Sequence, residues 1–394
     1  MKDVILAANA GSSSLKMSIF DVENKKINTL LHHVFLEKEE DEIIMHVDNI
    51  EIAEKFPSYP FNGDLISLMI DTFESWWENQ EGMRLVATGH RVAHGGSIFT
   101  KPIKVTDTIY KQLQELIPLA PLHQPYNLKS LNMSMEQYPD KIHVACFDTG
   151  FHSSQSRLAQ SFGLPKKFYD EGIYKYGFHG LSYQWITQSI KNLYNQNFPE
   201  KMIVAHLGNG ASMCAIKNGF SIESSMSFSA LDGLMMGTRS GSIDPGVILY
   251  LLTHCKMTIE EVTKLLYRQS GLLGVSGESY DIRALLESDN IDAKFAIDLF
   301  VHKAHLEIGR LTSALGGLDT LVFTAGIGEN SAVMRANIVA NLEWLGIKLD
   351  NDRNENHKHA DSDYISSNDS KVKIWVIPTN EERIIAENVA NLLY

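Results

Sequence analysis

The earliest stretch of the chain whose residue types suit chemistry is Asn9-Ala10-Gly11-Ser12-Ser13-Ser14-Leu15-Lys16. Apolar runs flank it, which predicts a strand, a tight polar turn and a second strand. Such a turn gathers backbone N–H groups, serine hydroxyls and the Lys16 cation around a small hollow, which suits an anion with several oxygens, such as a nucleotide phosphate tail. It is not a Walker A loop, because no glycine directly precedes Lys16 and a strand follows where a helix is required. An ordinary Ser-rich hairpin turn is the structural alternative.

Two further stretches place an arginine among glycines. Arg91 lies within the stretch GHRVAHGG at residues 89–96, and Arg239 lies within GTRSG at residues 237–241. Guanidinium groups are planar, permanently charged forks that suit carboxylates and phosphates. We therefore treat both stretches as candidate site loops, with a basic surface turn as the alternative.

An acid stands where a buried strand is expected to end. The apolar residues 142–147 predict that strand, and Asp148 follows directly. The carboxyl end of a strand is where α/β enzymes place metal ligands and catalytic groups. A helix N-cap or turn aspartate is the alternative.

The pattern of the opening stretch recurs about 200 residues later. An apolar run ends at Leu207, the small residues 208–212 follow, and a second apolar run comes after them. This repeats strand, turn and strand, so we expect two related halves. A third glycine stretch, residues 325–330, joins an expected strand to an expected helix over 331–345. A strand, glycines and a helix N-terminus can seat a nucleotide, although a short G-x-G is a weak signal by itself.

The elements that must position these residues follow from periodicity and caps. Helical spacing or end signals predict helices over 64–80, 106–117, 182–195, 291–315 and 381–394, and Thr258 with Glu261 predicts a capping box. Residues 373–377 are expected to form a strand and 350–371 an exposed loop or hairpin. A change in composition around 150–180 predicts the domain boundary.

Composition limits the function. A chain of 394 residues is too long for one comfortable core, so we expect two domains. The net charge of −13 argues against nucleic acid as a partner. The N-terminal residues lack a signal-peptide pattern and no apolar run reaches membrane-spanning length, so we expect a cytoplasmic protein with no membrane partner. Cys146, Cys214 and Cys255 are expected to be buried free thiols rather than a disulfide or a metal site.

Eight stretches together resemble the acetokinase family of the acetate and sugar kinase and actin superfamily. They run nearly end to end in family order, so the resemblance is highly specific. The matching stretches are NAGSSSLK at 9–16, GHRVAHGG at 89–96, FDTGFH at 147–152, YGFHG at 176–180, HLGNGAS at 206–212, LMMGTRSGSIDP at 234–245, TAGIGEN at 324–330 and IPTNEE at 377–382.

The resemblance implies an α/β protein with a two-domain actin-like ATPase fold and duplicated ribonuclease-H-like βββαβα cores. Its domains would be 1–150 and 151–380, with the helix at 381–394 packing on the first. It implies reversible, Mg²⁺-dependent transfer of the γ-phosphoryl group of ATP to acetate, giving acetyl phosphate and ADP, with Mn²⁺ able to substitute for Mg²⁺. It also implies a homodimer formed through the second domain.

The resemblance also implies residue roles. Arg91 would hold the carboxylate of the acid, and Arg239 with His179 would steady the transferring phosphoryl group. Asp148 matches the catalytic acid of the family. Because a small carboxylic acid is already ionised at pH 7, we favour a role for Asp148 in orienting Arg91 or Mg²⁺-bound water over general base catalysis. Asn9 and Glu381 match the Mg²⁺ positions.

The remaining positions bind nucleotide or substrate by the same resemblance. The expected nucleotide-binding residues are Ser12, Ser14, Lys16, His206, Leu207, Gly208, Asn209, Gly210, Asp281, Ile282, Arg283, Gly326, Ile327, Gly328, Glu329 and Asn330. The alkyl end of the acid is expected to lie against Ala93, Leu122, Phe178 and Ala230.

The sequence departs from the family pattern at several positions, of which two carry information about the substrate. Ala93 stands where the family commonly has valine, and Ala230 where it has the proline of FTPLEGL. Both changes remove apolar bulk around the alkyl end, which leaves the identity of the acid open. Ser242 replaces the first aspartate of GDIDP, and nothing in the sequence explains that change.

Alternative functions therefore remain. A propionate kinase or broad short-chain carboxylate kinase of the same family would use the same machinery. A non-catalytic actin-like nucleotide switch shares the fold, but it needs no second anion site, so the set of Arg91, Asp148, His179 and Arg239 speaks against it. A sugar kinase would need a base for a neutral hydroxyl and a polar lining for the sugar.

Overall fold

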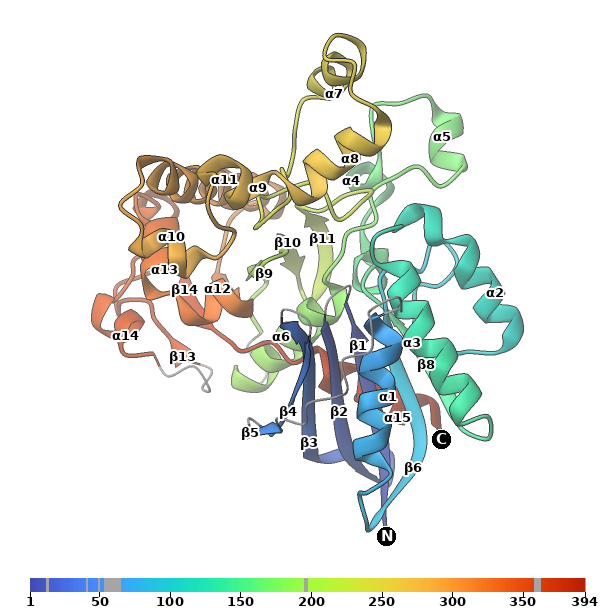
Figure 1. Cartoon of the computed structure of the whole chain (residues 1–394). Coiled ribbons are helices and arrows are strands. Elements are labelled where there is room, and N and C mark those ends of the chain that lie inside the picture. The colour runs from blue at the N-terminus through green and yellow to red at the C-terminus, as the bar shows by residue number, and fades with distance from the viewer. Residues whose placement is uncertain are drawn as a thin grey trace. The chain divides into compact units, whose positions relative to one another are not determined.

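The chain divides into two compact units, each with its own sheet and core (Figure 1). The computed structural model describes residues 1–11, 14–39, 42–48, 50–52, 65–194, 198–357 and 363–393. Unit 1 comprises Met1–Phe151 and Asn380–Tyr394, and unit 2 comprises His152–Thr379. The α/β class expected from the sequence is confirmed.

Unit 1 contains, among the described residues, an eight-stranded sheet of order β5-β4-β3-β2-β1-β6-β8-β7. Strands β1 to β5 pair antiparallel in sequence order, whereas β1, β6 and β8 run parallel. The carboxyl ends of β1, β6 and β8 therefore meet at one edge. The strands are β1 (Lys2–Ala10), β2 (Ser14–Glu23), β3 (Lys26–Glu39), β4 (Glu42–Val47), β5 (Ile50–Ile52), β6 (Met83–Val92), β7 (Ile103–Lys104) and β8 (Ile142–Phe147).

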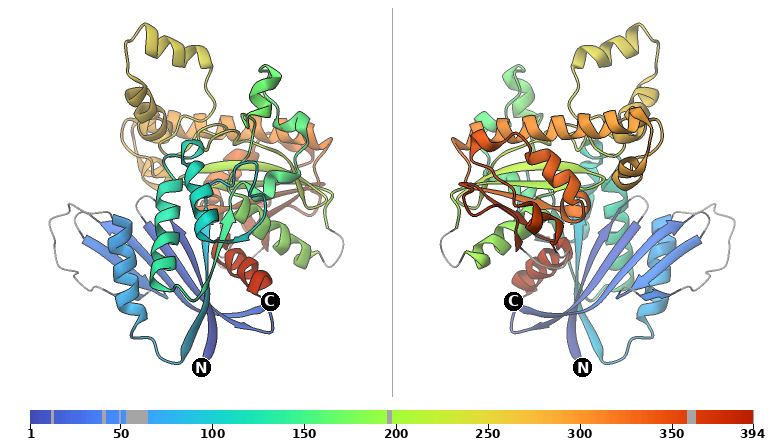
Figure 2. Two further views of the ribbon diagram at one scale, coloured as in Figure 1. Left: turned by 90° about the vertical axis from the view of Figure 1, so that its right-hand side faces the viewer. Right: turned by 90° about the vertical axis from the view of Figure 1, so that its left-hand side faces the viewer.

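Helices cover both faces of this sheet (Figure 2). Helices α1 (Leu65–Trp77) and α3 (Gln124–Gln137) pack on one face, and α2 (Asp107–Glu115) packs against α3. Helix α15 (Glu381–Leu393) lies on the other face, against β1 and β6. A Cβ atom on Gly89 would lie 2.5 Å from side-chain carbons of Ile385 and Val389, so only glycine lets β6 approach α15 this closely.

Unit 2 repeats this arrangement on a sheet that has six strands in its described residues, of order β11-β10-β9-β12-β14-β13. Strands β9, β10 and β11 pair antiparallel, and β9, β12 and β14 run parallel. This matches the pairing of β1 to β3 and β6, so the expected similarity of two halves is confirmed. The strands are β9 (Lys201–Leu207), β10 (Ala211–Lys217), β11 (Phe220–Ser224), β12 (Thr320–Thr324), β13 (Asp363–Tyr364) and β14 (Lys373–Val376).

The core of unit 2 forms between its sheet and the long helix α11 (Ile291–Leu315). Alternate residues of β9 and β12, such as Ala205 and Phe323, face α11, and helix α6 (Gly180–Leu193) packs against β9. The other helices of the unit are α4 (Arg157–Gln160), α5 (Lys166–Asp170), α7 (Pro245–Thr253), α8 (Ile259–Arg268), α9 (Gly271–Ser276), α10 (Ile282–Glu287), α12 (Ala325–Asn330), α13 (Ala332–Val339) and α14 (Asn351–Glu355).

Several local predictions are confirmed. The capping box of Thr258 and Glu261 opens α8, with both of its hydrogen bonds present. Helix α11 has the expected bounds and ends at Gly316, whose φ of 69° is the left-handed conformation that glycine adopts without cost. Helix α15 begins at Glu381, as expected.

Other predictions are wrong. The glycine stretch 325–330 is itself a short helix, α12, rather than a loop before a helix. The helix expected over 331–345 ends at Val339, and Asn341, with φ 64°, turns the chain. Cys146 and Cys214 are buried free thiols, but Cys255 is exposed because it follows the solvent-facing helix α7. The stretch 350–371 contains α14 and β13, with 358–362 outside the described residues.

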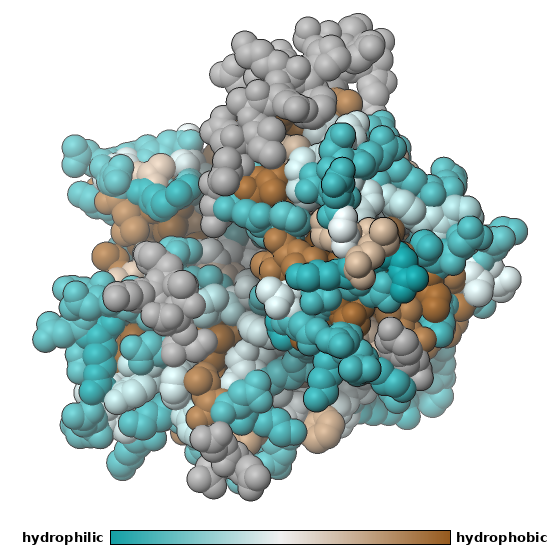
Figure 3. All heavy atoms as spheres, turned by 90° about the horizontal axis from the view of Figure 1, so that it is seen from below, coloured by the Kyte–Doolittle hydropathy of each residue, from teal (hydrophilic) through white to brown (hydrophobic). Residues whose placement is uncertain are grey.

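The face drawn in Figure 3 mixes hydrophilic side chains with smaller apolar areas. Within the described ranges, helices that combine the length and the apolar character needed to cross a bilayer are absent.

Candidate functional site

Three predicted residues of unit 1 meet at the edge where its parallel strands end. Asn9 lies near the end of β1, Arg91 near the end of β6, and Asp148 directly after β8. The Arg91 guanidinium grips the Asp148 carboxylate: Nε lies 3.0 Å from both carboxylate oxygens, and Nη2 lies 2.6 Å from Oδ2. Arg91 Nη1 donates to Asn9 Oδ1 at 3.0 Å. The strand register thus brings the predicted substrate arginine, acid and metal-site amide into one cluster.

The electrostatics of this cluster are those of a buried ion pair. The Asp148 side chain is 2% exposed and that of Arg91 22% exposed. Burial raises the pKa of the Asp148 carboxyl above its usual range, and Arg91 opposes that rise. Burial by itself would lower the pKa of the Arg91 guanidinium, but Asp148 and Glu381 outweigh it and raise that pKa. Because its oxygens accept from the guanidinium, Asp148 is suited to orient Arg91 rather than to take up a proton.

The first turn of α15 completes the cluster. Asn9 Nδ2 donates to Glu381 Oε2 at 3.0 Å and to Glu382 Oε1 at 3.4 Å. Both glutamates are 9% exposed. The sequence analysis assigned a role to Glu381 and missed Glu382. The signal that would have found it is the pair of acids opening a helix, because two successive residues there both reach the end of β1.

The other predicted residues of the opening turn are Ser12, Ser14 and Lys16, and the structure describes two of them. Ser12 lies outside the described residues. Ser14 opens β2 and its carbonyl accepts from Gly11 N at 2.8 Å. Lys16 lines an open hollow on the sheet with His33, Phe35, Glu37 and His46, and its Nζ lies 5.9 Å from the Phe35 ring centroid.

In unit 2, His179 and Arg239 converge on the turn between β9 and β10. A Cβ atom placed on Gly210 would lie 3.4 Å from His179 Nε2 and 3.7 Å from Arg239 Nη1. His179 has a φ of 56°, an unfavourable left-handed conformation for a histidine, and precedes α6. The two side chains therefore present a ring nitrogen and a guanidinium at one glycine, an arrangement that suits an anion.

A hydrogen-bonded network holds the His179 ring in place. His179 Nδ1 lies 2.8 Å from Ser212 Oγ, and the ring stacks on that of His206 with 4.2 Å between centroids. His206 Nδ1 in turn lies 2.8 Å from Ser182 Oγ, in the first turn of α6. Because Nδ1 of His179 is engaged with β10, its Nε2 is directed to the Gly210 turn.

A cavity of about 620 Å³ in unit 2 is lined by half of the predicted nucleotide-binding residues. The predicted residues that line it are Gly208, Asn209, Asp281, Ile282, Arg283, Gly326, Ile327 and Asn330. Residues that the sequence analysis missed also line it, namely Tyr280, Leu286, Glu287, Ser331, Ala332 and Val333. Most of these adjoin predicted residues in sequence or lie one helical turn away on α10, so proximity to the motif was the available signal.

Five predicted nucleotide residues of unit 2 are not part of the cavity lining. His206, Leu207 and Gly210 lie in or beside β9 and its turn, and Gly328 is buried inside α12. Glu329 turns to the backbone, where its Oε1 accepts from Ala325 N at 2.7 Å and from Thr379 N at 2.9 Å. The Glu329 carboxylate therefore satisfies the first backbone N–H group of the helix to which Glu329 itself belongs, α12.

The four expected neighbours of the acid's alkyl group are divided between the units. Ala93 is 4% exposed and its N–H donates to Asn127 Oδ1 at 2.9 Å, and Leu122 is half-buried; both belong to unit 1. Phe178 is 3% exposed and Ala230 packs against the same core; both belong to unit 2.

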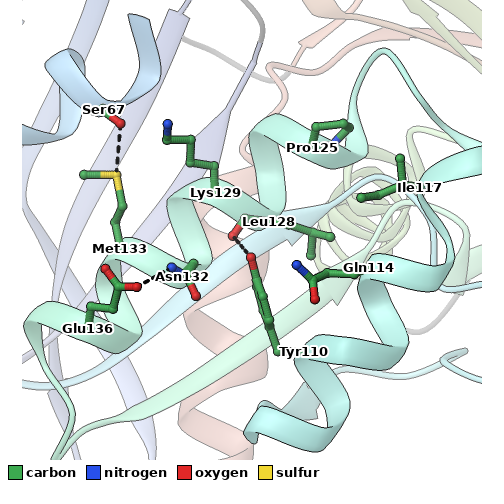
Figure 4. A pocket seen from close by; sticks show the side chains of 10 residues that line it. All are labelled: Ser67, Tyr110, Gln114, Ile117, Pro125, Leu128, Lys129, Asn132, Met133 and Glu136. Carbon is green, nitrogen blue, oxygen red and sulfur yellow. Dashed lines mark hydrogen bonds between the residues drawn. The ribbon is translucent and has the colours of Figure 1, made fainter. Parts of the chain in front are cut away.

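Unit 1 also has a cavity of about 460 Å³ between α1, α2 and α3 (Figure 4). Tyr110 on α2 donates to Leu128 O on α3 at 3.3 Å, and Asn132 donates to Glu136 Oε1 within α3 at 2.7 Å, so these polar side chains are engaged with the surrounding helices. It contains no residue that the sequence analysis assigned to a site, and we give it no role.

The comparisons with known proteins agree with this arrangement. The model of the acetokinase family matches residues 4–387. An acetate kinase of Rickettsia felis is 54% identical over 393 residues, which cover 100% of both chains. The crystal structure of Porphyromonas gingivalis acetate kinase superposes with a TM-score of 0.85 at 30% identity over 100% of both chains. That of a propionate kinase from Francisella tularensis superposes with a TM-score of 0.88 at 33% identity over 98% of both. The chain belongs to the acetokinase family and is a kinase that transfers phosphate to a carboxylate.

Proposed function

We propose that this chain transfers the γ-phosphoryl group of ATP reversibly to acetate, with Mg²⁺, giving acetyl phosphate and ADP. The observation that carries the proposal is the convergence of His179 Nε2 and Arg239 Nη1 on Gly210. Their turn adjoins Gly208 and Asn209, which line the 620 Å³ cavity. A phosphate chain that extends from a nucleoside in that cavity would meet both side chains.

The chemistry asks for charge stabilisation rather than for a base. A carboxylate with a pKa near 4 is ionised at pH 7, so no proton has to be removed before it attacks phosphorus. The barrier lies in bringing an anion to a polyanion and in stabilising charge on the equatorial phosphoryl oxygens. Arg239 and His179 would stabilise that charge, and Arg91, oriented by Asp148, would bind the attacking carboxylate.

The residues of unit 1 fit a magnesium ion. Asn9 and Glu381 offer hard oxygen ligands within one hydrogen-bonded cluster. Among the described residues, no group of three or more His, Cys, Asp or Glu side chains would hold a metal alone. That is the pattern for Mg²⁺, which proteins usually bind through one or two carboxylates, water and substrate phosphates. When bound, Mg²⁺ neutralises charge on the phosphates, and Mn²⁺ is expected to substitute.

We further propose that the enzyme accepts acids longer than acetate. Alanine at positions 93 and 230 is smaller than the valine and proline of the family pattern, which would leave room for about one or two methylene groups at the alkyl end of the acid. Acetate gains nothing from that room, whereas burial of one more methylene contributes about 0.8 kcal/mol. We therefore propose that propionate is also a substrate.

A homodimer through unit 2 is supported by helix α7. The sequence of α7, PGVILYLLT, is almost wholly apolar, yet none of its residues is buried. Val247, Leu249 and Tyr250 are 42%, 62% and 53% exposed, and Ile259 at the start of α8 is 70% exposed. In Figure 1, α7 stands away from the sheet of unit 2 beside α8. An apolar helix in water is costly, and a second copy of the chain would cover it.

Replacing the phosphoryl-site arginine tests the central proposal. Arg239→Ala should lower kcat by about 10³-fold, because a transition-state cation is lost. Arg91→Ala should in addition raise the KM for acetate, and its thermal unfolding must be checked because Asp148 would be left buried without its partner. Steady-state kinetics with acetate and ATP measure both effects. Near wild-type turnover in both variants would refute the phosphoryl-transfer role.

The metal proposal is tested by titration. Glu381→Gln should raise the Mg²⁺ concentration for half-maximal activity by roughly tenfold or more, because it removes a negative charge from the proposed metal site, and substitution of outer-shell partners alone typically costs about 10–100-fold in metal affinity. Glu387→Gln, on the same helix but paired with Arg383, is the control and should leave the titration unchanged. An unaltered Mg²⁺ titration curve for Glu381→Gln would contradict the metal-binding role and leave Glu381 only the role of an acid that stabilises a helix N-terminus.

Substrate breadth is tested by the ratio of kcat/KM for acetate and propionate. We expect the wild type to use propionate within about tenfold of acetate, because the smaller alanines would accommodate the extra methylene, whose discrimination in an apolar pocket is otherwise worth about 10–200-fold. Ala93→Val should depress propionate use more than acetate use. A wild-type preference for acetate above about a hundredfold, unmoved by Ala93→Val, would mean that neighbouring side chains refill the space.

The dimer proposal predicts a solution mass of twice the chain mass of 44.2 kDa, measured by light scattering. Leu249→Glu should yield monomers, because a buried unpaired charge opposes association. Leu158→Glu, at an 89% exposed leucine on α4, is the control and should leave the dimer intact. A monomeric wild type, or a dimeric Leu249→Glu variant, contradicts the use of α7.

A further inference from the structure

We call residues 228–242 the arginine loop, because they carry Arg239. Two hydrogen bonds between Gly233 and Ser242 close this loop, and we call that pair of residues its neck. At the neck, Ser242 N donates to Gly233 O at 2.9 Å, and Gly233 N donates to Ser242 Oγ at 3.0 Å. Gly233 has a φ of 99°, and its Cβ would lie 2.5 Å from Ser225 O. The crossing chains thus approach too closely for a side chain at this position.

A carboxylate fastens this neck. Asp232 Oδ1 accepts from Ser242 Oγ at 2.6 Å, and Asp232 Oδ2 accepts from Ser227 Oγ at 2.5 Å. Ser227 is 4% exposed, whereas Ser242 is exposed, so the carboxylate joins the protein interior to the returning end of the loop. Hydrogen bonds to a charged acceptor are about twice as strong as neutral ones. The hydroxyl of Ser242 makes two hydrogen bonds at the neck: it donates to the Asp232 carboxylate and accepts from the backbone N–H of Gly233.

The turn that Asp232 and Ser227 close provides a hydrogen-bond acceptor for Arg239, the carbonyl oxygen of Ala230. Ala230 lies between Ser227 and Asp232, and its carbonyl oxygen accepts from Arg239 Nη1 at 2.9 Å. That same Nη1 is the atom near Gly210. The position of Arg239 Nη1 is therefore tied to a carbonyl whose turn is closed by Ser227 and Asp232 and whose loop is closed by Ser242.

We propose that Asp232, with the hydroxyls of Ser227 and Ser242, is a positioning site for Arg239 in phosphoryl transfer. The proposal rests on the proposed role of Arg239. It also accounts for Ser242, which stands where the family pattern has an acid, because a hydroxyl can donate to the Asp232 carboxylate, whereas an ionised carboxylate can only accept. Asp232 and both serines act through Arg239 and touch no substrate.

Removal of one hydroxyl tests this assignment. Ser242→Ala should lower kcat roughly tenfold with little change in the KM for ATP or acetate, because displacement of a transition-state group affects the chemical step. Ser242→Thr keeps a hydroxyl and should restore most of the activity. Ser240→Ala is the control, since that hydroxyl, in the same loop, donates to Gly241 O at 3.0 Å and should leave kcat unchanged. Unchanged kcat in Ser242→Ala, or loss without rescue by threonine, overturns the proposal.

A double-mutant cycle distinguishes failure of this positioning proposal from failure of the proposed role of Arg239 in phosphoryl transfer. If the cluster acts through Arg239, Ser242→Ala should have almost no further effect on kcat in the Arg239→Ala background. An equal loss in both backgrounds would show that the cluster acts on another group. Normal turnover in Arg239→Ala alone would instead refute the proposed role of Arg239. Thermal unfolding of each variant verifies the fold, and Asp232→Asn, which keeps one acceptor oxygen, provides a second variant with a smaller expected loss.

Discussion

The buried ion pair between Arg91 and Asp148 is the interaction on which the candidate site residues of unit 1 depend for their orientation. Two charges have left water, and only their close, multiply hydrogen-bonded contact offsets that cost. The contact requires β6 and β8 to run parallel and in register, so that their carboxyl ends present the two side chains together. A pair of this kind contributes little net stability. Its value here lies in a guanidinium that is held in one orientation before any substrate arrives.

Unit 2 also holds two candidate site side chains, Arg239 and His179, in defined positions. Its cation, Arg239, is held by a backbone carbonyl, and His179 is held by a serine hydroxyl and a stacked ring. The Asp232 carboxylate accepts from the hydroxyls of Ser227 and Ser242, and it acts on Arg239 through the backbone of the Ala230 turn.

Local patterns predicted much of the fold and of the site. Apolar runs located β8, caps located the ends of α8 and α11, and the strand ends led to Asp148. The failures share a cause. Glu329 caps its own helix and Glu382 reaches Asn9, and both outcomes depend on which of several possible partners lies nearest after folding. Ser242 was not interpretable from the sequence because its partner, Asp232, is ten residues away across a closed neck.

The hydrogen bond from Asn9 to Glu381 joins residues 372 positions apart and has a consequence for synthesis. Unit 1 is assembled from residues 1–151 and 380–394, with the whole of unit 2 between them. As a ribosome works from the N-terminus, unit 2 can fold as soon as it emerges, while β1 and β6 still lack α15 against one face of their sheet. The apolar surface that Gly89 offers to Ile385 and Val389 stays uncovered during that interval. Translation must therefore pass position 380 before the side-chain amide of Asn9 acquires its carboxylate partners on α15, whereas both hydrogen-bond partners of Arg91 in this cluster, Asp148 and Asn9, are already synthesised.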